Sequence, residues 1–488
     1  MNFLRRKSVA DLQAEALTDN SLKRALGPWH LVLLGVGCTI GTGIFVLTGT
    51  VAARNAGPGV ILSFVLAGIA SIFAAFCYSE FASLVPMSGS AYTYSYATLG
   101  EVFAWIIGWD LILEYAVGGI TVAIGWSGYV TSFLHDCGLD LPPRLTAAHN
   151  TLVTLADGTQ APALFNLPAV LIVGAVTLLL IVGIRESAWY NNLIVIVKLA
   201  VIVAFLAFAV HAINPANWHP FIPANAGTFG HFGWSGIMAG SGTVFFAYIG
   251  FDAVSTAAQE TKNPQRDMPL GIIGSLIICT VLYIAVAAVA TGVVPYGQLD
   301  TPAPIALVAD HAVGGWMSVL IKIGAIAGLS SVIMVLLLGQ TRIFWVMSRD
   351  GLLPKFVGEV HPRFKTPWIT TIITGFIVAM FSALFTVREA GNLCSIGTLL
   401  AFVIVCISVL VLRVREPHHP RAFRTPWIWF VAPVGAISAL ALMVPLPNAA
   451  WLRLIVWFII GMVIYFAYSM KNSRLNKPAG AAPPNPHG

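Results

Sequence analysis

Long apolar segments separated by short polar ones run along almost the whole chain of 488 residues. A helix needs roughly 20 consecutive apolar residues to cross the hydrocarbon core of a bilayer. Twelve segments reach about that length, and we expect each to form a transmembrane helix. They cover residues 30–51, 59–84, 98–131, 162–184, 189–212, 233–257, 269–294, 315–346, 367–387, 392–412, 425–445 and 451–470.

The composition supports helices embedded in lipid. Of the residues, 58% are apolar and 9% are charged, whereas soluble globular domains carry about 25% charged residues. The chain also contains 45 Gly, 28 Pro and 14 Trp. Membrane helices tolerate Gly and Pro, and Trp gathers at the membrane interfaces. These features exclude a soluble globular protein and predict an all-α polytopic membrane protein whose surroundings are a lipid bilayer.

The positive charges are distributed unevenly between alternate loops. If the N-terminus is cytoplasmic, twenty of the 26 Lys and Arg residues lie on the cytoplasmic side. Four, namely Arg54, Arg144, Arg388 and Arg453, lie outside, and Lys198 and Lys322 lie within the membrane. Cytoplasmic loops of membrane proteins carry such an excess. The formal net charge of +6 is therefore a topology signal that places both termini in the cytoplasm, and no nucleic-acid partner is expected.

The ends of the chain are polar. Residues 1–28 form a cytoplasmic segment that is either a short interfacial helix or a mobile tail. Residues 471–488 include the run KPAGAAPPNPHG and are expected to be a disordered cytoplasmic tail.

Two of the twelve segments are interrupted by glycines. The first contains Gly35, Gly37, Gly41 and Gly43, and the sixth contains Gly236, Gly240, Gly242 and Gly250. Each glycine costs up to about 1 kcal/mol in a helix interior, so both helices are weakened. We expect residues 29–214 and 231–415 to be two inverted repeats of five helices, followed by two further helices at 424–470. The two weakened helices then occupy corresponding positions, which is the best sequence indication of a transporter binding site.

A break in a membrane helix exposes backbone groups that suit one class of ligand. N–H groups at the start of a half-helix attract a carboxylate, and the freed carbonyl groups accept hydrogen bonds from an ammonium. An amino acid carries both groups on one carbon atom. The alternative is that the glycines only allow helices to pack closely.

Ionisable residues inside the membrane are functional candidates because their burial is costly. Lys198 lies roughly 14 Å from the inner end of its helix, near the midplane of the membrane. Loss of water favours the neutral amine, so this lysine is suited to exchanging a proton. The alternative is a permanently charged lysine that carbonyl groups hold for structural reasons.

Polar residues on the third, sixth and eighth segments add further candidates. Asp110 and Glu114 lie on one face of the third helix because they are four residues apart. Glu114 either receives the cationic end of a substrate or is a protonated carboxyl bonded to a neighbouring helix, and Asp110 is structural. Asp252 is expected to hold the unwound part of the sixth segment, and Lys322 to extend toward the outer interface. Ser330 and Ser331 offer hydroxyl groups near the first break, unless they bond only to their own backbone.

Several motifs along the chain resemble the amino acid–polyamine–organocation superfamily, and within it the cationic amino acid transporters of the bacterial type. The resemblance extends from about residue 20 to residue 470. It rests on Gly41-Thr-Gly-Ile-Phe45, Trp109-Asp-Leu-Ile-Leu-Glu-Tyr115, Phe245-Phe-Ala-Tyr-Ile-Gly-Phe-Asp-Ala-Val254, Asn263-Pro-Gln-Arg266, Gln340-Thr-Arg-Ile343 and Ser348-Arg-Asp-Gly-Leu-Leu-Pro354.

The resemblance implies an inverted five-plus-five fold with discontinuous first and sixth helices. It implies that the substrate carboxylate meets backbone amides near Thr42 and Gly43, with the Phe246 ring as a gate. The substrate ammonium would meet carbonyl groups near four residues: Thr39, Phe246, Ala247 and Ile249. Lys198 matches the lysine that, in relatives, lies close to the first break and the eighth span. That match implies coupling to a proton, no sodium site and no cofactor.

The sequence therefore predicts a secondary active transporter of neutral or cationic L-amino acids that works by alternating access in the bacterial inner membrane. Two alternatives remain: an amino acid exchanger, and a sensor that binds amino acids without moving them. A membrane enzyme is not expected, because no catalytic motif such as His-Glu-x-x-His is present. The sequence leaves open whether a small membrane protein is a partner.

Overall fold

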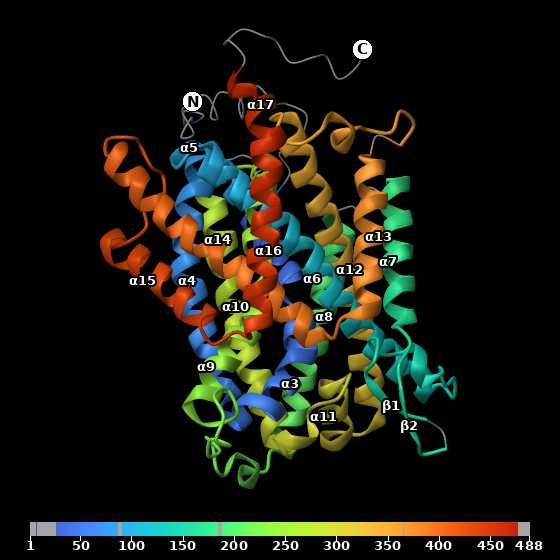
Figure 1. Ribbon diagram of the computed structural model, residues 1–488. Coiled ribbons are helices and arrows are strands. Elements are labelled where there is room, and N and C mark those ends of the chain that lie inside the picture. Colours follow the sequence, from blue (N-terminus) through green and yellow to red (C-terminus); the bar gives the residue numbers. More distant parts are fainter. Residues whose placement is uncertain are drawn as a thin grey trace.

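The computed structural model describes residues 26–85, 90–155, 157–183, 188–364 and 366–476, together with Arg6. This part of the chain is a bundle of helices that run mostly along one axis (Figure 1). One small antiparallel hairpin, β1 (Leu152–Thr154) and β2 (Gln160–Pro162), lies in the loop after the third span, and the sequence did not predict it. The expected polytopic all-α architecture is confirmed.

Every one of the twelve expected segments contains at least one helix. Among the described residues, eight helical stretches are long and apolar enough to cross a membrane, and four apolar helices are shorter. The main helices are α2 (Pro28–Thr39), α3 (Thr48–Val51), α4 (Val60–Leu84), α5 (Ser90–Thr98), α6 (Glu101–Asp136), α7 (Leu167–Val182), α8 (Ala188–Ala209), α9 (Gly233–Val244), α10 (Pro264–Val293), α11 (Pro304–Ala312), α12 (Gly315–Arg349), α13 (Trp368–Leu384), α14 (Val387–Arg415), α15 (Ile428–Met443), α16 (Asn448–Ile464) and α17 (Met470–Asn472).

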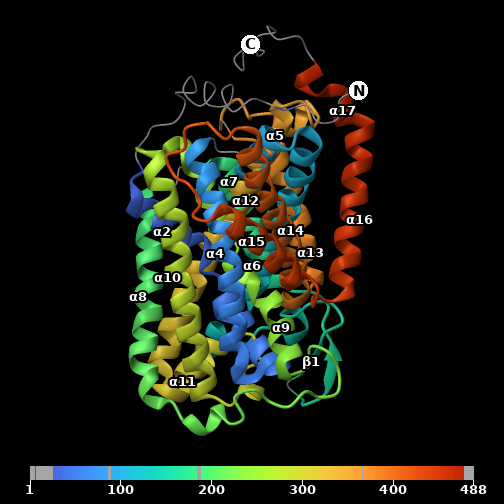
Figure 2. The same cartoon turned by 90° about the vertical axis from the view of Figure 1, so that its left-hand side faces the viewer.

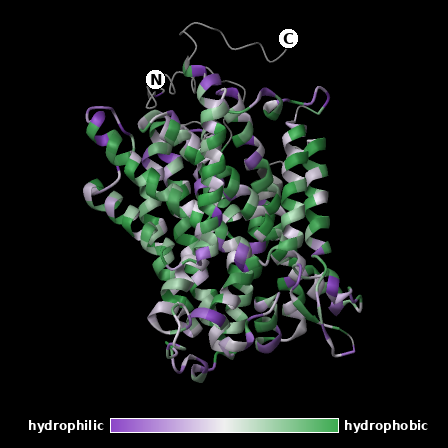
Figure 3. Ribbon diagram, viewed as in Figure 1, coloured by the Kyte–Doolittle hydropathy of each residue, from purple (hydrophilic) through white to green (hydrophobic). Residues whose placement is uncertain are grey.

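Apolar residues dominate the middle of the bundle, and hydrophilic residues gather at its two ends (Figure 3). Large apolar side chains such as Leu178 of α7, Phe376 of α13 and Val463 of α16 are exposed on peripheral helices. Lipid would cover such surfaces in a membrane protein. The interior is formed where α6 packs against α12 and where α10 packs against α2 and α4 (Figure 2).

The two ends of the bundle differ. We call the end that carries α5 and α17 the basic end, since Arg349, Arg413 and Arg415 lie near it, and the end that carries α11, β1 and β2 the distal end (Figure 1). The charge distribution predicts that the basic end is cytoplasmic. The expected terminal segments at 1–28 and 471–488 fall mostly outside the described residues.

Two buried glutamates tie helices together at the basic end. Glu80 of α4 accepts hydrogen bonds from Arg413 Nε at 2.7 Å and Nη2 at 2.9 Å, and from the backbone N–H of Thr425 at 2.8 Å. Glu101 of α6 accepts hydrogen bonds from the hydroxyl groups of Tyr96, Tyr465 and Ser473. These bonds join α4, α6 and α14 to the C-terminal part of the chain.

Lys322 has a partner that the sequence did not predict. Its side chain is buried and its ammonium pairs with the carboxylate of Asp136, the last residue of α6, at the distal end. A carboxylate within reach stabilises the buried ammonium, which then has no need to reach water.

The first and sixth segments are both discontinuous, as expected. In the first, α2 ends at Thr39, Ile40 has an extended backbone, and a wider helical turn resumes at Gly43–Leu47 before α3. In the sixth, α9 ends at Val244 and a short 3-10 turn covers Phe245–Tyr248. Ile249 is then extended, Gly250 has φ of +116°, and a second 3-10 stretch covers Asp252–Glu260.

The glycines of the sixth segment do not all serve the break. Gly236, Gly240 and Gly242 lie inside the regular helix α9. A Cβ atom at Gly236 would lie 2.1 Å from the carbonyl oxygen of Asn55, so this glycine permits close packing. Both interpretations of the glycines therefore apply, and only Gly250 lies at the break itself.

Candidate functional site

The two breaks lie directly against each other. A Cβ atom added to Gly43 would be 2.3 Å from the Cα atom of Ala247, so the backbones are in contact there. A Cβ atom at Gly250 would be 2.9 Å from the carbonyl carbon of Cys38, at the end of α2. With its positive φ, Gly250 is a position where other residues would be strained. Glycine at these two positions is what brings the broken ends together.

One tyrosine connects the two breaks. The hydroxyl group of Tyr283, on α10, lies 2.8 Å from the carbonyl oxygen of Thr39 and 2.7 Å from that of Ala247. A hydroxyl group has a single hydrogen to donate, so the two carbonyl groups share it. The sequence reasoning missed Tyr283. The signal was present, because a tyrosine in the middle of an apolar span needs a partner for its hydroxyl group.

Lys198 of α8 lies at the first break and is 1% exposed. Its Nζ donates hydrogen bonds to the carbonyl oxygens of Gly37 at 2.6 Å and Ile40 at 2.9 Å. These carbonyl groups are at the C-terminal end of α2, where a helix has unpaired acceptors and a partial negative charge. The lysine stem lies against α12, since a Cβ atom at Gly328 would be 3.1 Å from Lys198 Cδ. The structure thus brings Lys198, the first break and the eighth span together.

At the sixth break, Asp252 is the charged residue that corresponds to Lys198, and its charge is opposite. It starts the second half of that segment, and its Oδ1 accepts a hydrogen bond from the backbone N–H of Gly250 at 3.3 Å. A carboxylate at the start of a helical segment is stabilised by the free N–H groups there.

The second half of the first segment begins at the expected substrate-binding residues. Thr42 precedes the turn that starts at Gly43, and both are buried. Within the described residues, the hydroxyl groups of Thr39 and Thr42 have no hydrogen-bond partner. Tyr129 of α6 donates to the carbonyl oxygen of Phe45 at 2.8 Å and so positions this half-helix.

The remaining predicted contacts belong to the sixth break. Phe246, Ala247 and Ile249 are all buried. The carbonyl oxygen of Phe246 accepts a hydrogen bond from the backbone N–H of Ile249 at 3.2 Å. A carbonyl oxygen has two lone pairs, so those of Phe246 and Ala247 each retain capacity for another donor.

Glu114 and Asp110 of α6 are buried carboxyl groups. Their side chains are 1% and 5% exposed, and none of their carboxyl oxygens has a hydrogen-bond partner among the described residues. Glu114 lies within electrostatic range of Asp110 and of Asp252 at the sixth break. Burial of an unpaired carboxylate is costly, so this cluster is suited to a proton or to an organic cation.

The two serines of α12 are already bonded. Ser330 donates to the carbonyl oxygen of Ile326 at 2.7 Å and accepts a hydrogen bond from the indole N–H of Trp126 at 2.8 Å. Ser331 donates to the carbonyl oxygen of Gly328 at 2.8 Å. Among the described residues, neither hydroxyl group forms a hydrogen bond with the ammonium of Lys198. Over the part of the chain that the structure describes, no group of three or more His, Cys, Asp or Glu residues is arranged to hold a metal ion.

Known proteins of similar sequence are transporters. Residues 26–465 match the sequence pattern of the family described as amino acid permease. The chain is 48% identical to the branched-chain amino acid permease BcaP of Bacillus subtilis over 98% of this chain and 99% of that protein. It is 45% identical to the methylthioribose transporter of the same organism, over 98% of this chain and all of that protein.

A more distant relative carries the name that the motifs suggested. The chain is 41% identical to the vacuolar cationic amino acid transporter 2 of Arabidopsis thaliana, over 86% of this chain and 64% of that protein. The resemblance inferred from the motifs is confirmed. This chain belongs to the amino acid permease family, within the amino acid–polyamine–organocation superfamily, and is a membrane transporter and not an enzyme.

Proposed function

We propose that this transporter carries L-amino acids across the plasma membrane by alternating access, binds them at the two breaks and couples their movement to a proton. Amino acid transport follows from the family. The binding site, the coupled ion and the cytoplasmic position of both termini are our proposal.

The proposed binding mode rests on one observation. Two broken helices have four ends, and charged side chains bind two of them, while the Tyr283 hydroxyl takes only one lone pair of the Ala247 carbonyl at a third. The ammonium of Lys198 occupies the C-terminal end of α2, and the carboxylate of Asp252 occupies the start of Asp252–Glu260. The other two ends are the N–H groups near Thr42 and Gly43 and the carbonyl groups near Phe246 and Ala247. These suit a carboxylate and an ammonium respectively.

The proton proposal rests on the surroundings of Lys198. The ammonium is bonded to two carbonyl groups, and no carboxylate pairs with it among the described residues. Loss of its proton would weaken both bonds to the end of α2, and so would link protonation to the geometry of the first break. An amine that occupies this place also leaves no room for a sodium ion, and no cofactor is required.

The choice of substrate side chain is a second question. The named relatives act on branched-chain amino acids, methylthioribose or cationic amino acids according to their names. Glu114 favours a cationic side chain, because its buried carboxyl group has no partner among the described residues. Methylthioribose has neither a carboxylate nor an ammonium, and so would offer the two ends only neutral hydroxyl groups.

The test is uptake into empty proteoliposomes under an imposed pH gradient. Labelled L-leucine, L-arginine and methylthioribose are compared, each with an excess of unlabelled competitor amino acids. Gradient-driven accumulation of an amino acid is expected. Uptake only into vesicles preloaded with amino acid would identify an exchanger, and uptake of methylthioribose alone would refute the proposed binding mode. Binding without any counterflow would identify a sensor.

A further inference from the structure

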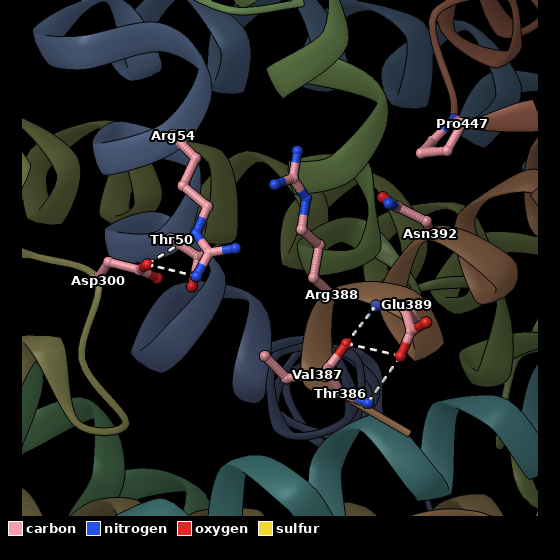
Figure 4. A pocket seen from close by; sticks show the side chains of 9 residues that line it. All are labelled: Thr50, Arg54, Asp300, Thr386, Val387, Arg388, Glu389, Asn392 and Pro447. Atoms are coloured by element: carbon pink, nitrogen blue, oxygen red, sulfur yellow. Dashed lines mark hydrogen bonds and ion pairs between the residues drawn. The ribbon is translucent and has the colours of Figure 1, made fainter. Parts of the chain in front are cut away.

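The positive charges at the distal end of the bundle are used within the protein. Each of the five cationic side chains there has an acceptor or a carboxylate partner, and these five are Arg54, Arg144, Lys322, Arg388 and Arg453. Figure 4 shows the pair of Arg54 and Asp300, which are joined by a hydrogen bond of 2.7 Å at the wall of a cavity of about 360 Å³. Among the described residues, the distal end therefore has no cationic side chain without a partner.

The segment between α12 and α13, at the basic end, is different. It contains Lys355 and Arg363, and Arg349 is the last residue of α12 just before it. Among the described residues, no carboxylate lies within 4.0 Å of these three cations, and no acceptor receives a hydrogen bond from their side chains. Residues 354–366 include a single acidic residue, Glu359. The segment thus carries positive charge that the protein does not compensate.

The same segment exposes large apolar side chains. Phe356, Val360 and Phe364 are 52%, 41% and 36% exposed. The guanidinium of Arg363 lies over the ring of Phe364, 5.7 Å from its centroid. Apolar side chains that are exposed together mark a contact with a partner or a membrane. We call the following six residues the interfacial patch: Arg349, Lys355, Phe356, Val360, Arg363 and Phe364.

Hydrogen bonds hold this segment in a folded conformation. Ser348 donates to the carbonyl oxygen of Pro354 at 3.0 Å, and Thr366 donates to that of Ile181, on α7, at 2.8 Å. The backbone N–H of His361 donates to the carbonyl oxygen of Thr366 at 2.8 Å. The segment therefore lies against the basic ends of α7 and α12, where Figure 1 shows it above α7 and α13.

The helices next to the patch present apolar surface up to their ends. Val182, the last residue of α7, is exposed, and so is Ile372 in the second turn of α13. In a membrane protein such side chains contact lipid. The patch then lies at the level where the lipid head groups begin. Aromatic side chains favour this level, and basic side chains there attract anionic lipids.

We propose that the interfacial patch binds an anionic phospholipid, with the phosphate group on its three cations and the acyl chains along its apolar side chains. A Lys or Arg residue near an anionic membrane surface contributes about a fivefold preference. A zwitterionic lipid has the same acyl chains but no net charge, so only the cations distinguish the two. A soluble acidic partner would suit the cations but not the position of the patch beside lipid-facing helices.

The distal end supplies an internal comparison. Its loop at residues 213–235 exposes Phe229 and Trp234 but contains no Lys or Arg. Exposed aromatic side chains therefore occur at both ends of the bundle, whereas the cations of the patch have no counterpart in this loop. We expect a preference for anionic lipid at the patch and none at the distal loop.

The test measures the local lipid composition with a fluorescent label. Cys137 is the exposed cysteine, so it is replaced by serine, and a bimane group is attached to Val360→Cys. The protein is reconstituted into phosphatidylcholine vesicles in which a minor share of the lipid has brominated acyl chains that quench the label. This brominated lipid is either phosphatidylglycerol or phosphatidylcholine. We expect phosphatidylglycerol to quench at least about five times more strongly.

Removal of the cations should abolish this preference. When Arg349→Gln, Lys355→Gln and Arg363→Gln are combined, both brominated lipids should quench equally, and each single substitution should give an intermediate ratio. The combination of Arg349→Lys, Lys355→Arg and Arg363→Lys keeps the charges and should keep the ratio, which separates loss of charge from loss of folding. Arg144→Gln removes one charge at the distal end and should leave the ratio unchanged.

A second label position tests the location. With Phe229→Cys in place of Val360→Cys, the two brominated lipids should quench equally. Equal quenching at residue 360 in the protein with all three cations would overturn the proposal, and so would a preference that survives their replacement by Gln. Absence of quenching by either lipid would also overturn it, since the patch would then lie away from the membrane. No substrate is present, so the result does not depend on the proposed function.

Discussion

The first and sixth breaks have the same backbone design but opposite charges. At the first break, the ammonium of Lys198 binds the carbonyl end of α2. At the sixth, the carboxylate of Asp252 accepts a hydrogen bond from the backbone N–H of Gly250, and Glu114 lies within electrostatic range of Asp252 and of Asp110. Each side chain carries the charge that suits the helix end it contacts.

The difference explains how broken helices persist in an apolar interior. Each unpaired backbone group costs free energy when no water is present. One end of each break is satisfied by a side chain, Tyr283 donates to carbonyl groups at both, and one end of each remains for a ligand. In our proposal, the basic first break and the acidic sixth break then have separate tasks, coupling at the first and recognition of a cation at the sixth.

The largest effect is expected from replacing Lys198, the basic residue at the first break. Lys198→Ala should abolish gradient-driven uptake of amino acids, because the proposed proton carrier is lost. Uptake under an imposed pH gradient measures this. Lys198→Arg is the matched variant, since arginine keeps the charge and the donors but does not release a proton; it should retain exchange while losing accumulation. Full gradient-driven uptake by either variant would contradict the proton role.

The contact between the breaks is tested by Gly43→Ala. The added Cβ atom would lie 2.3 Å from Ala247 Cα, so the two breaks must separate. Overpacking of this kind costs about 1–3 kcal/mol, and we expect a lower thermal unfolding midpoint and a strongly reduced uptake rate. Gly41→Ala is the control, because its Cβ atom would meet its nearest neighbour, Val332, at 3.7 Å. Equal effects of the two substitutions would show that the close contact is unimportant.

The acidic character of the sixth break is tested by Glu114→Gln. If Glu114 receives a cationic side chain, the KM of the variant for L-arginine should rise about tenfold, since a charged hydrogen bond is removed. Transport of L-alanine should change little, and competition between the two amino acids measures the difference. Equal losses for both would exclude Glu114 from the side-chain pocket.

The smallest effect is expected from removing the hydroxyl group of Tyr283, which joins the two breaks. Tyr283→Phe removes one shared hydroxyl group, worth about 0.5–1.5 kcal/mol, and should slow uptake several-fold. Tyr248→Phe is the comparison, because Tyr248 also donates to a carbonyl oxygen, that of Phe64 at 2.8 Å, without joining the two breaks. A larger transport defect in the Tyr248 variant would refute the bridging role of Tyr283.

Most of the fold follows from the sequence, because lipid imposes a simple local rule. An apolar run of sufficient length becomes a helix, and all twelve expected segments contain one. The discontinuities of the first and sixth segments were also predictable, since glycines and a following acidic residue are local signals. The hairpin β1–β2 was missed because its strands are only three residues long.

The sequence by itself determined which residues are chemically suited to a site: Lys198, Glu114 and Asp252 stand out because charges in apolar segments are costly. Only the tertiary structure decided their partners. It placed Tyr283 between the carbonyl groups of Thr39 and Ala247, and Arg388 beside Asn55. It also showed that Gly236 serves packing. Contacts of this kind join residues far apart in the chain, and no local pattern of hydrophobicity or charge encodes them.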